Sequence, residues 1–398
     1  MDITISPRKL SGTLTAIPSK SQAHRLLICA AFSNCQTTLY CPATNQDIEA
    51  TADCLRSLGA NITRTDVGYC VTPVDSVPKE AVLNCRESGS TLRFMLPIVG
   101  ALGVDATFVM AGRLPQRPLS PMWEEIERNG CSVCRPTENT IRCTGKLKAG
   151  NYMIDGSVSS QFITGLLFAM ALIPGESQLT VTGKAESKPY IEMTQRALSL
   201  FGVSTMQYRV CGSYPFTTPG EISVEGDWSN GAFFLAAKAL GSNLDVLGLD
   251  CNSAQGDRAI ASILDKMDDF ITIDAADIPD LVPILAVTAG AKSGAVFKNI
   301  GRLRLKESDR VSSVAKMLEN LGARVITEQD DLTVYPAHYQ GCTIDAVGDH
   351  RIAMAAAIAA TVASGPVTIL GAQCVAKSYP SFWEEYGRLG GYYEQHIR

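Results

Sequence analysis

Six long apolar runs recur along the chain, each beginning a few residues after a serine or an aspartate. These polar residues are spaced by 69, 69, 70, 53 and 69 positions: Ser19, Ser88, Ser157, Asp227, Asp280 and Asp349. The runs that follow them are Leu26–Phe32, Leu92–Leu102, Phe162–Ile173, Ala232–Leu240, Leu281–Ala289 and Ile352–Val362. Because they are apolar on nearly every side, they predict helices buried inside domains. Ser and Asp are good N-caps, so each helix is expected to begin at its polar residue.

A second helix, amphipathic in pattern, is expected in each period, and it ends at a glycine or a polar pair. The predicted ends lie at Gly59, Gly130, Gly202, Asp268, Gly322 and Gly390. Glycine suits the left-handed residue that closes a helix. Alternating stretches after these ends, such as Asn61–Arg64 and Arg324–Thr327, predict strands. Met1–Ile5 is also expected to be a strand.

Each period is therefore a unit of about 70 residues of mixed helix and strand, which suggests duplication. Six units divide into two groups of three, so the fold class is α/β with two domains. In each domain three buried helices are expected to pack together, with sheets and outer helices around them. Helix N-termini carry partial positive charge and free N–H groups, so their shared end should attract phosphate and carboxylate.

Composition supports two globular domains, because 398 residues exceed what one core usually organises. The chain is 46% hydrophobic and 19% charged, and its net charge of −5 implies no general affinity for nucleic acid or membranes. The longest apolar runs, such as Gly165–Ile173 and Ile352–Ala363, are too short to span a bilayer. The opening residues lack the basic and apolar regions of a signal peptide.

The 13 cysteines are an odd number scattered through a large chain, which fits reduced thiols in the cytoplasm. Cys131 and Cys134 form a lone Cys-x-x-Cys without a second pair or a nearby histidine. On a strand their side chains should point to opposite faces. We therefore expect no metal site there, but two buried small side chains.

The segments before the predicted buried helices carry more than caps. Hydroxyls and the cations Lys20, Arg25 and Arg93 occur in the first half, which is a composition suited to phosphate. In the second half, His350 and Arg351 directly precede an apolar helix, where charge is costly unless it is paired or liganded. Capping alone explains one hydroxyl per helix, but not these cations, so anion binding is expected.

Five strings in order along the chain resemble segments of the 5-enolpyruvylshikimate-3-phosphate synthase family. They are Ser19-Lys20-Ser21, Gly156-Ser157-Val158-Ser159-Ser160-Gln161, Ser187-Lys188-Pro189-Tyr190, Leu305-Lys306-Glu307-Ser308-Asp309-Arg310 and Gly348-Asp349-His350-Arg351. The resemblance implies two inside-out α/β domains, each of three βαβαββ-like repeats around buried parallel helices. It also implies that residues 1–18 join 227–398 in one discontinuous domain, with 19–226 inserted, and that the active site lies in the cleft between them.

The resemblance implies roles for individual residues. Shikimate 3-phosphate would be held by Lys20, Ser21, Arg25, Ser159, Ser160, Gln161, Ser187, Tyr190, Asp280 and Lys306. Phosphoenolpyruvate would be held by Lys20, Gly89, Arg117, Gln161, Arg310, His350, Arg351 and Lys377. Catalysis would fall to Asp280, Glu307 and Lys20. The inserted domain would form the shikimate 3-phosphate side, and the discontinuous domain the phosphoenolpyruvate side.

The chemistry of such a reaction agrees with this division. A hydroxyl adds to C2 of phosphoenolpyruvate and phosphate is then eliminated, which needs a base and an acid that exchange roles. The substrates carry two phosphates and two carboxylates, so a dense Arg and Lys clamp is expected. With that clamp complete, no metal or cofactor is required. The resemblance further implies a monomer, the two small-molecule substrates as the only partners, and inhibition by glyphosate.

Three positions depart from the common pattern of the family. Glu87 stands where many relatives have Asn, Phe94 where many have Pro, and Arg302 where a common Asn contacts the shikimate ligand.

Rival interpretations fit less well. The sister enzymes acting on UDP-N-acetylglucosamine carry a reactive Cys in the loop before a phosphoenolpyruvate arginine, whereas Gly112–Arg117 contains none. A non-catalytic anion-binding protein would have no need of the pair Asp280 and Glu307. A nucleotide-binding enzyme is disfavoured because neither phosphate-binding glycine motif is present.

Overall fold

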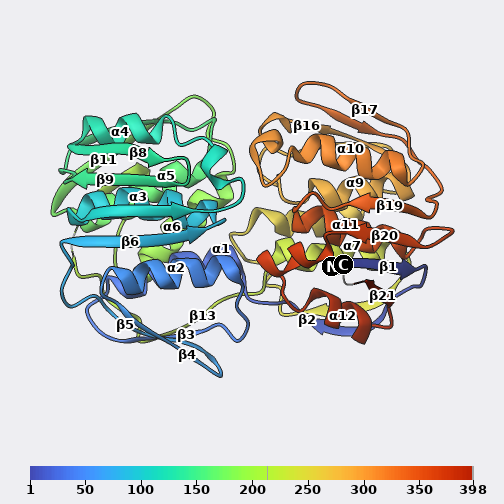
Figure 1. Ribbon diagram of the computed structural model, residues 1–398, viewed down its shortest axis with the longest axis horizontal. Helices are drawn as coiled ribbons and strands as arrows, with labels where there is room; N and C mark the ends of the chain where they lie inside the picture. The colour runs from blue at the N-terminus through green and yellow to red at the C-terminus, as the bar shows by residue number, and fades with distance from the viewer. Residues whose placement is uncertain (213, 397–398) are drawn as a thin grey trace. The chain divides into compact units, whose positions relative to one another are not determined.

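The computed structural model describes residues 1–212 and 214–396, and its chain divides into two compact units. Unit 1 comprises residues 1–17 and 226–398, and unit 2 comprises Pro18–Glu225. The α/β fold class is confirmed, since helices and sheets alternate along both units (Figure 1). None of the helices in the described part of the chain is both long enough and apolar enough to cross a bilayer.

Unit 2 contains three sheets, with strand orders β13-β3-β5-β4, β6-β7-β9-β8 and β10-β11-β12. Their strands are β3 (Thr37–Tyr40), β4 (Asn61–Thr65), β5 (Gly68–Thr72), β6 (Glu80–Arg86), β7 (Asp105–Met110), β8 (Cys131–Thr137), β9 (Thr140–Gly145), β10 (Asn151–Asp155), β11 (Gly175–Thr182), β12 (Arg209–Gly212) and β13 (Glu221–Ser223). Its helices are α1 (Lys20–Ala31), α2 (Gln46–Ser57), α3 (Gly89–Leu102), η1 (Leu114–Gln116), α4 (Met122–Arg128), α5 (Ser160–Leu172), α6 (Lys188–Leu200) and η2 (Met206–Tyr208).

Unit 1 also contains three sheets, with strand orders β14-β2, β15-β16-β18-β17 and β19-β20-β1-β21. Their strands are β1 (Asp2–Ser6), β2 (Ser11–Thr15), β14 (Asn243–Leu247), β15 (Ile271–Asp274), β16 (Ala295–Lys298), β17 (Val325–Thr327), β18 (Leu332–Val334), β19 (Cys342–Asp345), β20 (Val367–Leu370) and β21 (Tyr392–His396). Its helices are α7 (Trp228–Ala239), η3 (Gly256–Ala259), α8 (Ile260–Leu264), α9 (Val282–Ala291), η4 (Gly301–Leu305), α10 (Arg310–Asn320), α11 (His350–Ala360), η5 (Ala372–Lys377) and α12 (Phe382–Arg388).

The repeat is most complete around α3 and α9. Strand β6 pairs in parallel with β7 across α3, and β9 then joins β7 antiparallel and pairs with β8. Around α9, β15, β16, β17 and β18 follow the same scheme. Helices such as α9 are buried along nearly their whole length, because their sequences are apolar on every side. Each unit therefore has its apolar helices in the middle, with its sheets and amphipathic helices outside.

Four of the six predicted buried-helix starts are correct, since Ser19, Ser88, Asp227 and Asp349 are N-caps. The prediction at Ser157 is wrong. Its N–H donates to Asp155 Oδ1 at 2.8 Å within a turn, and Ser159 caps the helix instead.

Asp280 is likewise not a cap. Helix α9 begins at Val282, with a proline in its first turn, and the Asp280 carboxylate bonds to cationic side chains instead.

Five of the six outer-helix ends are also correct, each followed by a glycine with positive φ: Gly59, Gly130, Gly202, Gly322 and Gly390. The exception is the end near Asp268, because α8 already stops at Leu264. Cys131 is buried and Cys134 exposed, so they point to opposite faces as expected, but the expectation that both are buried is wrong for Cys134.

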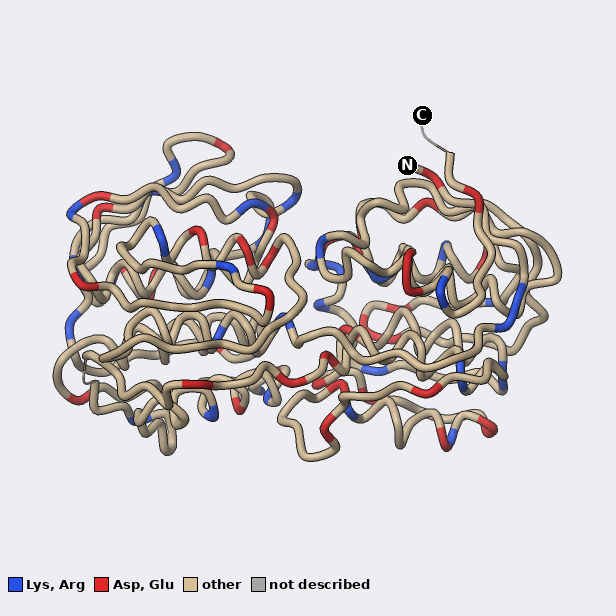
Figure 2. Tube along the Cα trace, turned by 90° about the horizontal axis from the view of Figure 1, so that it is seen from below, with Lys and Arg blue, Asp and Glu red and all other residues tan. Residues whose placement is uncertain are grey.

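Charged residues of both signs are mixed along the chain in both units (Figure 2). The polar sites must therefore be found from contacts between particular side chains.

Candidate active site

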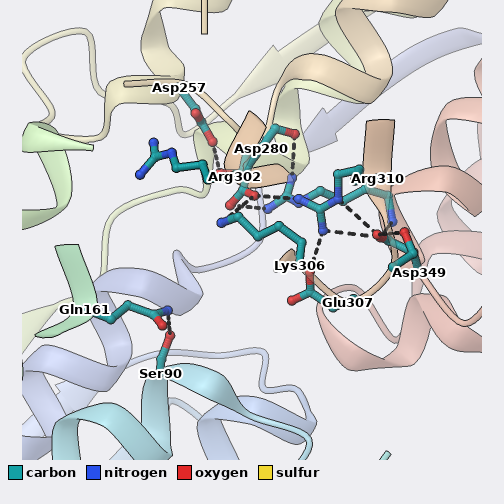
Figure 3. Close-up of polar contacts among 12 residues, drawn as sticks. Ser90, Gln161, Asp257, Asp280, Arg302, Lys306, Glu307, Arg310 and Asp349 are labelled. Carbon is teal, nitrogen blue, oxygen red and sulfur yellow. Dashed lines mark hydrogen bonds and ion pairs between the residues drawn. The ribbon is translucent and has the colours of Figure 1, made fainter. Parts of the chain in front are cut away.

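The centre of the unit 1 cluster is Arg310, the first residue of α10, whose side chain is 1% exposed. Its guanidinium donates to three carboxylates: Nε to Asp349 Oδ2 at 2.9 Å, one terminal nitrogen to Asp280 Oδ1 at 2.9 Å, and the other to Glu307 Oε2 at 2.6 Å (Figure 3). Burial alone would lower the pKa of Arg310, but these carboxylates raise it well above its usual value. Arg310 is thus a permanent cation that brings the two predicted catalytic carboxylates together.

Asp280 lies among further cations. Arg351 approaches Asp280 Oδ2 at 3.1 Å and donates to its backbone carbonyl at 3.2 Å, while Lys306 Nζ lies 3.8 Å from Oδ1. Burial lowers the pKa of Lys306 to about 8, although the attraction of Asp280 opposes this shift. Lys306 can therefore exchange a proton close to neutral pH.

Asp349, expected from the sequence as a helix cap and not as a site residue, lies at the centre of the cluster. It is fully buried and accepts hydrogen bonds from Ser308 Oγ at 3.0 Å and from the Arg351 backbone N–H at 3.0 Å. Burial would raise the pKa of Asp349, but Arg310 outweighs it and holds the pKa below its usual value. Its position directly before His350 and Arg351 was the available sequence signal.

Two more predicted residues lie at the start of α11 or beside it. His350 is the first residue of that helix and is buried. Lys377, the last residue of η5, donates from Nζ to the carbonyl of Gly348 at 3.2 Å, in the turn before α11. Arg302 donates to the Ala276 carbonyl from η4. The start of α11 is therefore surrounded by basic groups.

Asp257, on η3, was not predicted from the sequence. Its carboxyl is buried, with Oδ2 bonded to Ser229 Oγ and Oδ1 without a hydrogen-bond partner among the described residues. Burial and the charge of Asp280 raise the pKa of Asp257 to about 7. Asp257 is thus a second carboxyl group with a shifted pKa, and its charge interacts with that of Asp280.

In unit 2, the start of α1 carries three predicted residues. Lys20 Nζ contacts Asp47 Oδ2 at 2.9 Å. Arg25 is buried and donates to the Ser21 carbonyl at 2.6 Å, to the Tyr190 carbonyl at 2.9 Å and, through Nε, to a threonine hydroxyl on α6. Burial lowers the pKa of Arg25 to about 10. Among the described residues no carboxylate lies within ion-pair distance of Arg25, so its charge is available to an anion.

The start of α3 brings Gly89 against two guanidinium groups. A Cβ added at Gly89 would lie 2.6 Å from a terminal nitrogen of Arg117 and 3.0 Å from one of Arg93. Only a residue without a side chain allows Arg117, which follows η1, to come this close to the backbone. Gly89 and Arg117, both expected to hold phosphoenolpyruvate, therefore lie next to each other.

The start of α5 is held by Gln161, which connects it to α3. Its Oε1 accepts from Arg93 at 2.7 Å and its Nε2 donates to Ser90 Oγ at 2.9 Å (Figure 3). Ser159 Oγ accepts from the Gln161 backbone N–H at 3.2 Å, and Ser160 is the first, buried residue of the helix. The predicted polar string is thus split between capping and side-chain contacts.

Ser187 and Tyr190 lie at the start of α6. Ser187 is buried with a left-handed backbone, at φ 52°, directly before the helix, and its carbonyl accepts from the Tyr190 N–H at 3.0 Å. The Tyr190 carbonyl in turn accepts from Arg25. Arg25 thus connects the first turn of α6 to α1.

The predicted residues form one cluster in each unit. Unit 2 holds Lys20, Ser21, Arg25, Gly89, Arg117, Ser159, Ser160, Gln161, Ser187 and Tyr190. Unit 1 holds Asp280, Lys306, Glu307, Arg310, His350, Arg351 and Lys377. Both predicted ligand sets therefore draw residues from both units.

Comparison with known proteins explains this arrangement. The family model described as "EPSP synthase (3-phosphoshikimate 1-carboxyvinyltransferase)" matches residues 5–386. A 3-phosphoshikimate 1-carboxyvinyltransferase of Clostridium kluyveri is 37% identical over 98% of this chain and 97% of its own, and one of Clostridium beijerinckii is 34% identical over 99% and 98%. An EPSP synthase structure from Acinetobacter baumannii, 22% identical, has the same fold, with a TM-score of 0.81 over 99% of this chain and 100% of that chain. The chain belongs to the EPSP synthase family, the 3-phosphoshikimate 1-carboxyvinyltransferases.

Proposed function

We propose that the enzyme transfers the enolpyruvyl group of phosphoenolpyruvate to the 5-hydroxyl of shikimate 3-phosphate, in the biosynthesis of aromatic amino acids. The products are 5-enolpyruvylshikimate 3-phosphate and phosphate. The observation that carries this proposal is the set of two partly accessible carboxylates, Asp280 and Glu307, held by one buried cation, Arg310. Such a set can accept and return protons beside an anion-binding surface, which pure binding would not require.

Shikimate 3-phosphate is assigned chiefly to unit 2. Arg25 supplies a desolvated cation that has no carboxylate partner among the described residues, which favours an anionic ligand. The starts of α5 and α6 add the hydroxyls of Ser159, Ser160, Ser187 and Tyr190. Lys306 and Asp280, from unit 1, would reach the ring hydroxyl at which the reaction occurs.

Phosphoenolpyruvate is assigned to cations of both units. Arg117 lies against Gly89 at the start of α3, where backbone N–H groups are also available. Arg351 and Lys377 flank the start of α11, and Arg310 lies behind them. Guanidinium groups suit this ligand because they bind carboxylate and phosphate through two parallel hydrogen bonds.

The reaction divides into two proton-balanced steps. In the first, the 5-hydroxyl oxygen bonds to C2 of phosphoenolpyruvate, its proton passes to one carboxylate, and the methylene carbon takes a proton from an acid. In the second, the C–O bond to phosphate breaks, the phosphate leaves with the bonding electrons and takes the proton held by the first carboxylate, and the new methyl group returns a proton to the deprotonated acid. Asp280 and Glu307 are the proposed proton carriers, with Lys20 and Lys306 as neighbouring ammonium groups.

The active site is proposed to lie in a cleft between the two units that closes on the substrates. Each ligand set includes residues of both units, so bound substrates would favour a closed state over an open one. Small-angle scattering should give a smaller radius of gyration with both ligands than without them. A radius that does not change would contradict closure.

The enzyme is proposed to act as a monomer in the cytoplasm. All 13 cysteines are free, including the buried Cys29, Cys54 and Cys85, which suits a reducing compartment. Sedimentation at working concentrations tests the monomer, since a dimer would sediment at twice the mass.

Phosphate release tests the reaction. The purified enzyme should release phosphate from phosphoenolpyruvate with shikimate 3-phosphate, and none with UDP-N-acetylglucosamine. Arg351→Lys and Arg117→Lys should each raise the KM for phosphoenolpyruvate, because lysine cannot bind a carboxylate through two hydrogen bonds. Release with the nucleotide sugar alone, or unchanged KM values in both variants, would overturn the assignment.

A further inference from the structure

Four buried side chains form a continuous chain of hydrogen bonds beneath the binding residues of unit 2. His24 Nδ1 lies 2.6 Å from Thr51 Oγ1, Thr51 Oγ1 lies 2.7 Å from Thr91 Oγ1, and Thr91 Oγ1 donates to Ser88 Oγ at 2.8 Å. All four residues are almost wholly excluded from solvent. The chain connects α1 through α2 to the N-cap of α3, and none of its members has a proposed contact with substrate.

The donor in each of these hydrogen bonds can be assigned by counting hydroxyl hydrogens. Thr91 has one hydroxyl hydrogen, and it goes to Ser88, so the hydrogen between Thr51 and Thr91 must belong to Thr51. Thr51 then has none left, so His24 must donate from Nδ1. The hydroxyls of Thr51 and Thr91 therefore each accept from one neighbour and donate to the other.

The environment of His24 agrees with that tautomer. Its Nε2 has no hydrogen-bond partner among the described residues, and its ring meets the Phe94 ring edge-on at 6.3 Å. Burial and the nearby charges of Lys20 and Arg25 lower its pKa well below the usual value, so the imidazole is neutral. With the proton on Nδ1, the unpaired nitrogen is an acceptor, and a buried N–H donor is not left unsatisfied.

The two ends of this hydrogen-bonded network lie at two of the proposed anion-binding helix starts of unit 2, those of α1 and α3. His24 is between Lys20 and Arg25 in sequence, and Ser88 directly precedes Gly89. Ser88 Oγ receives two hydrogen bonds from Thr91, one from the hydroxyl and one from the backbone N–H at 3.3 Å. The chain thus fixes the cap that sets the position of Gly89.

We propose that His24, as the neutral Nδ1–H tautomer, is a positioning residue that orients the Thr51, Thr91 and Ser88 hydroxyls and thereby holds the start of α3 in register for phosphoenolpyruvate. This inference rests on the proposed function, because it uses the assignment of Gly89 and Arg117 to that ligand. It adds a network, buried behind the ligand residues, that sets phosphoenolpyruvate affinity without touching the ligand.

Thr51→Val tests the proposal because it keeps the shape of the side chain and removes the central hydroxyl. We expect the KM for phosphoenolpyruvate to rise roughly tenfold and the KM for shikimate 3-phosphate to change by less than about threefold, since the hydrogen bonds of Arg25 do not involve Thr51. Thr51→Ser should restore the wild-type values, because it retains the hydroxyl.

Thr37→Val is the matched control. Thr37 is another fully buried threonine of unit 2, paired with Thr218 at 2.6 Å, and its loss should reduce stability by a similar amount without changing either KM. Equal KM values for Thr51→Val and the wild type, or equal shifts in Thr51→Val and Thr37→Val, would overturn the proposal. Absence of wild-type activity would instead overturn the proposed function.

The tautomer can be measured on the wild-type enzyme, independently of activity and of how the variants fold. Two-bond ¹H–¹⁵N spectra of histidine-labelled protein should show His24 protonated at Nδ1 and bare at Nε2, with the resonance assigned by its loss in His24→Asn. A signal from the Nε2–H tautomer, or from an imidazolium at neutral pH, would contradict the chain direction.

Discussion

The two clusters differ in the groups that surround their buried arginine side chains. In unit 1, Arg310 is neutralised by Asp280, Glu307 and Asp349. In unit 2, the described residues that meet the equally buried Arg25 supply neutral oxygens and the Phe94 ring, whose centroid lies 5.2 Å from Cζ. A compensated cation serves to hold carboxylates, whereas an uncompensated one serves to bind an anion. This contrast supports the proposal that Asp280 and Glu307 of unit 1 carry protons and that Arg25 of unit 2 binds an anion.

Arg310→Ala is expected to have the largest effect among the variants that test this difference between the two clusters. It leaves Asp349 buried without its cation, and the expected loss of unfolding free energy is about 3–5 kcal/mol. Arg304→Ala is the control, because the Arg304–Asp309 pair at 3.2 Å is partly exposed and should contribute less than about 1 kcal/mol. Urea unfolding of both variants decides the matter, and similar losses would show that the Arg310 cluster is not specially stabilising.

Asp280→Asn and Glu307→Gln separate catalysis from binding. Each keeps the size of the side chain and removes its proton transfer, so turnover should fall by roughly two orders of magnitude while the substrates still bind. Calorimetry together with single-turnover kinetics gives both quantities. If binding collapses while turnover of the bound complex survives, the carboxylates are ligands.

Lowering the pH from 7 to 5 should change the stability of the two units in opposite directions. His24 has a lowered pKa in the folded state, so unit 2 loses stability as the pH falls below the unfolded value of about 6.5. Asp257 has a raised pKa of about 7, so its contribution strengthens unit 1 as the pH falls from 7 toward 4. Each slope is at most about 1.4 kcal/mol per pH unit.

Hydrogen exchange of α3 and α9 amides at pH 7 and 5, corrected for intrinsic rates, measures this divergence. His24→Asn should remove the slope in unit 2, and Asp257→Asn the one in unit 1. Parallel slopes in the two units would refute the assignment. Asp349, whose pKa is lowered, withdraws its stabilisation only at still lower pH, as the pH falls through that lowered value.

Gly89→Ala is expected to have the smallest effect of the four. The added methyl would meet the Arg117 guanidinium at 2.6 Å, so that flexible group must move. The KM for phosphoenolpyruvate should rise by up to about tenfold, with little change in melting temperature. Glyphosate, which is longer, should lose more affinity than phosphoenolpyruvate.

Gly387→Ala is the control for that variant, because its methyl would meet only Tyr393 at an ordinary 3.4 Å. Equal losses of affinity for glyphosate and phosphoenolpyruvate in Gly89→Ala would reject the idea that the methyl narrows their pocket.

Local signals in the sequence predicted the buried helices and most of their caps. Apolar runs after Ser19 or Asp349 are visible along the chain, because capping involves residues only a few positions apart. The starts at Ser157 and Asp280 were misplaced for equally local reasons, a turn closed by Asp155 and a proline at position 283.

Contacts between distant segments were not predictable in the same way. Arg310 meets Asp349 across 39 positions, and nothing in the sequence around Asp257 indicates that its carboxyl is buried. The residues assigned by family resemblance fall into compact clusters, but their ion-pair partners emerge only from the fold. Whether a side chain is buried depends on the helices and strands that pack around it. Those elements come from distant parts of the sequence, so one segment alone does not predict burial.

The first strand of the chain has a consequence for how the protein is made. Strand β1 pairs with both β20 and β21. Ile3 therefore cannot pair with Ile369 and Gln395 until nearly the whole chain has been synthesised. Unit 2, a continuous segment, can fold before then. Once folded, it holds Ser19 beside Glu225 through a 2.8 Å backbone hydrogen bond. The folded insertion of 208 residues (18–225) therefore connects the two segments of unit 1 as a short linker would. Most of the entropy cost of bringing these two segments together is then met before the sheet that contains β1 forms.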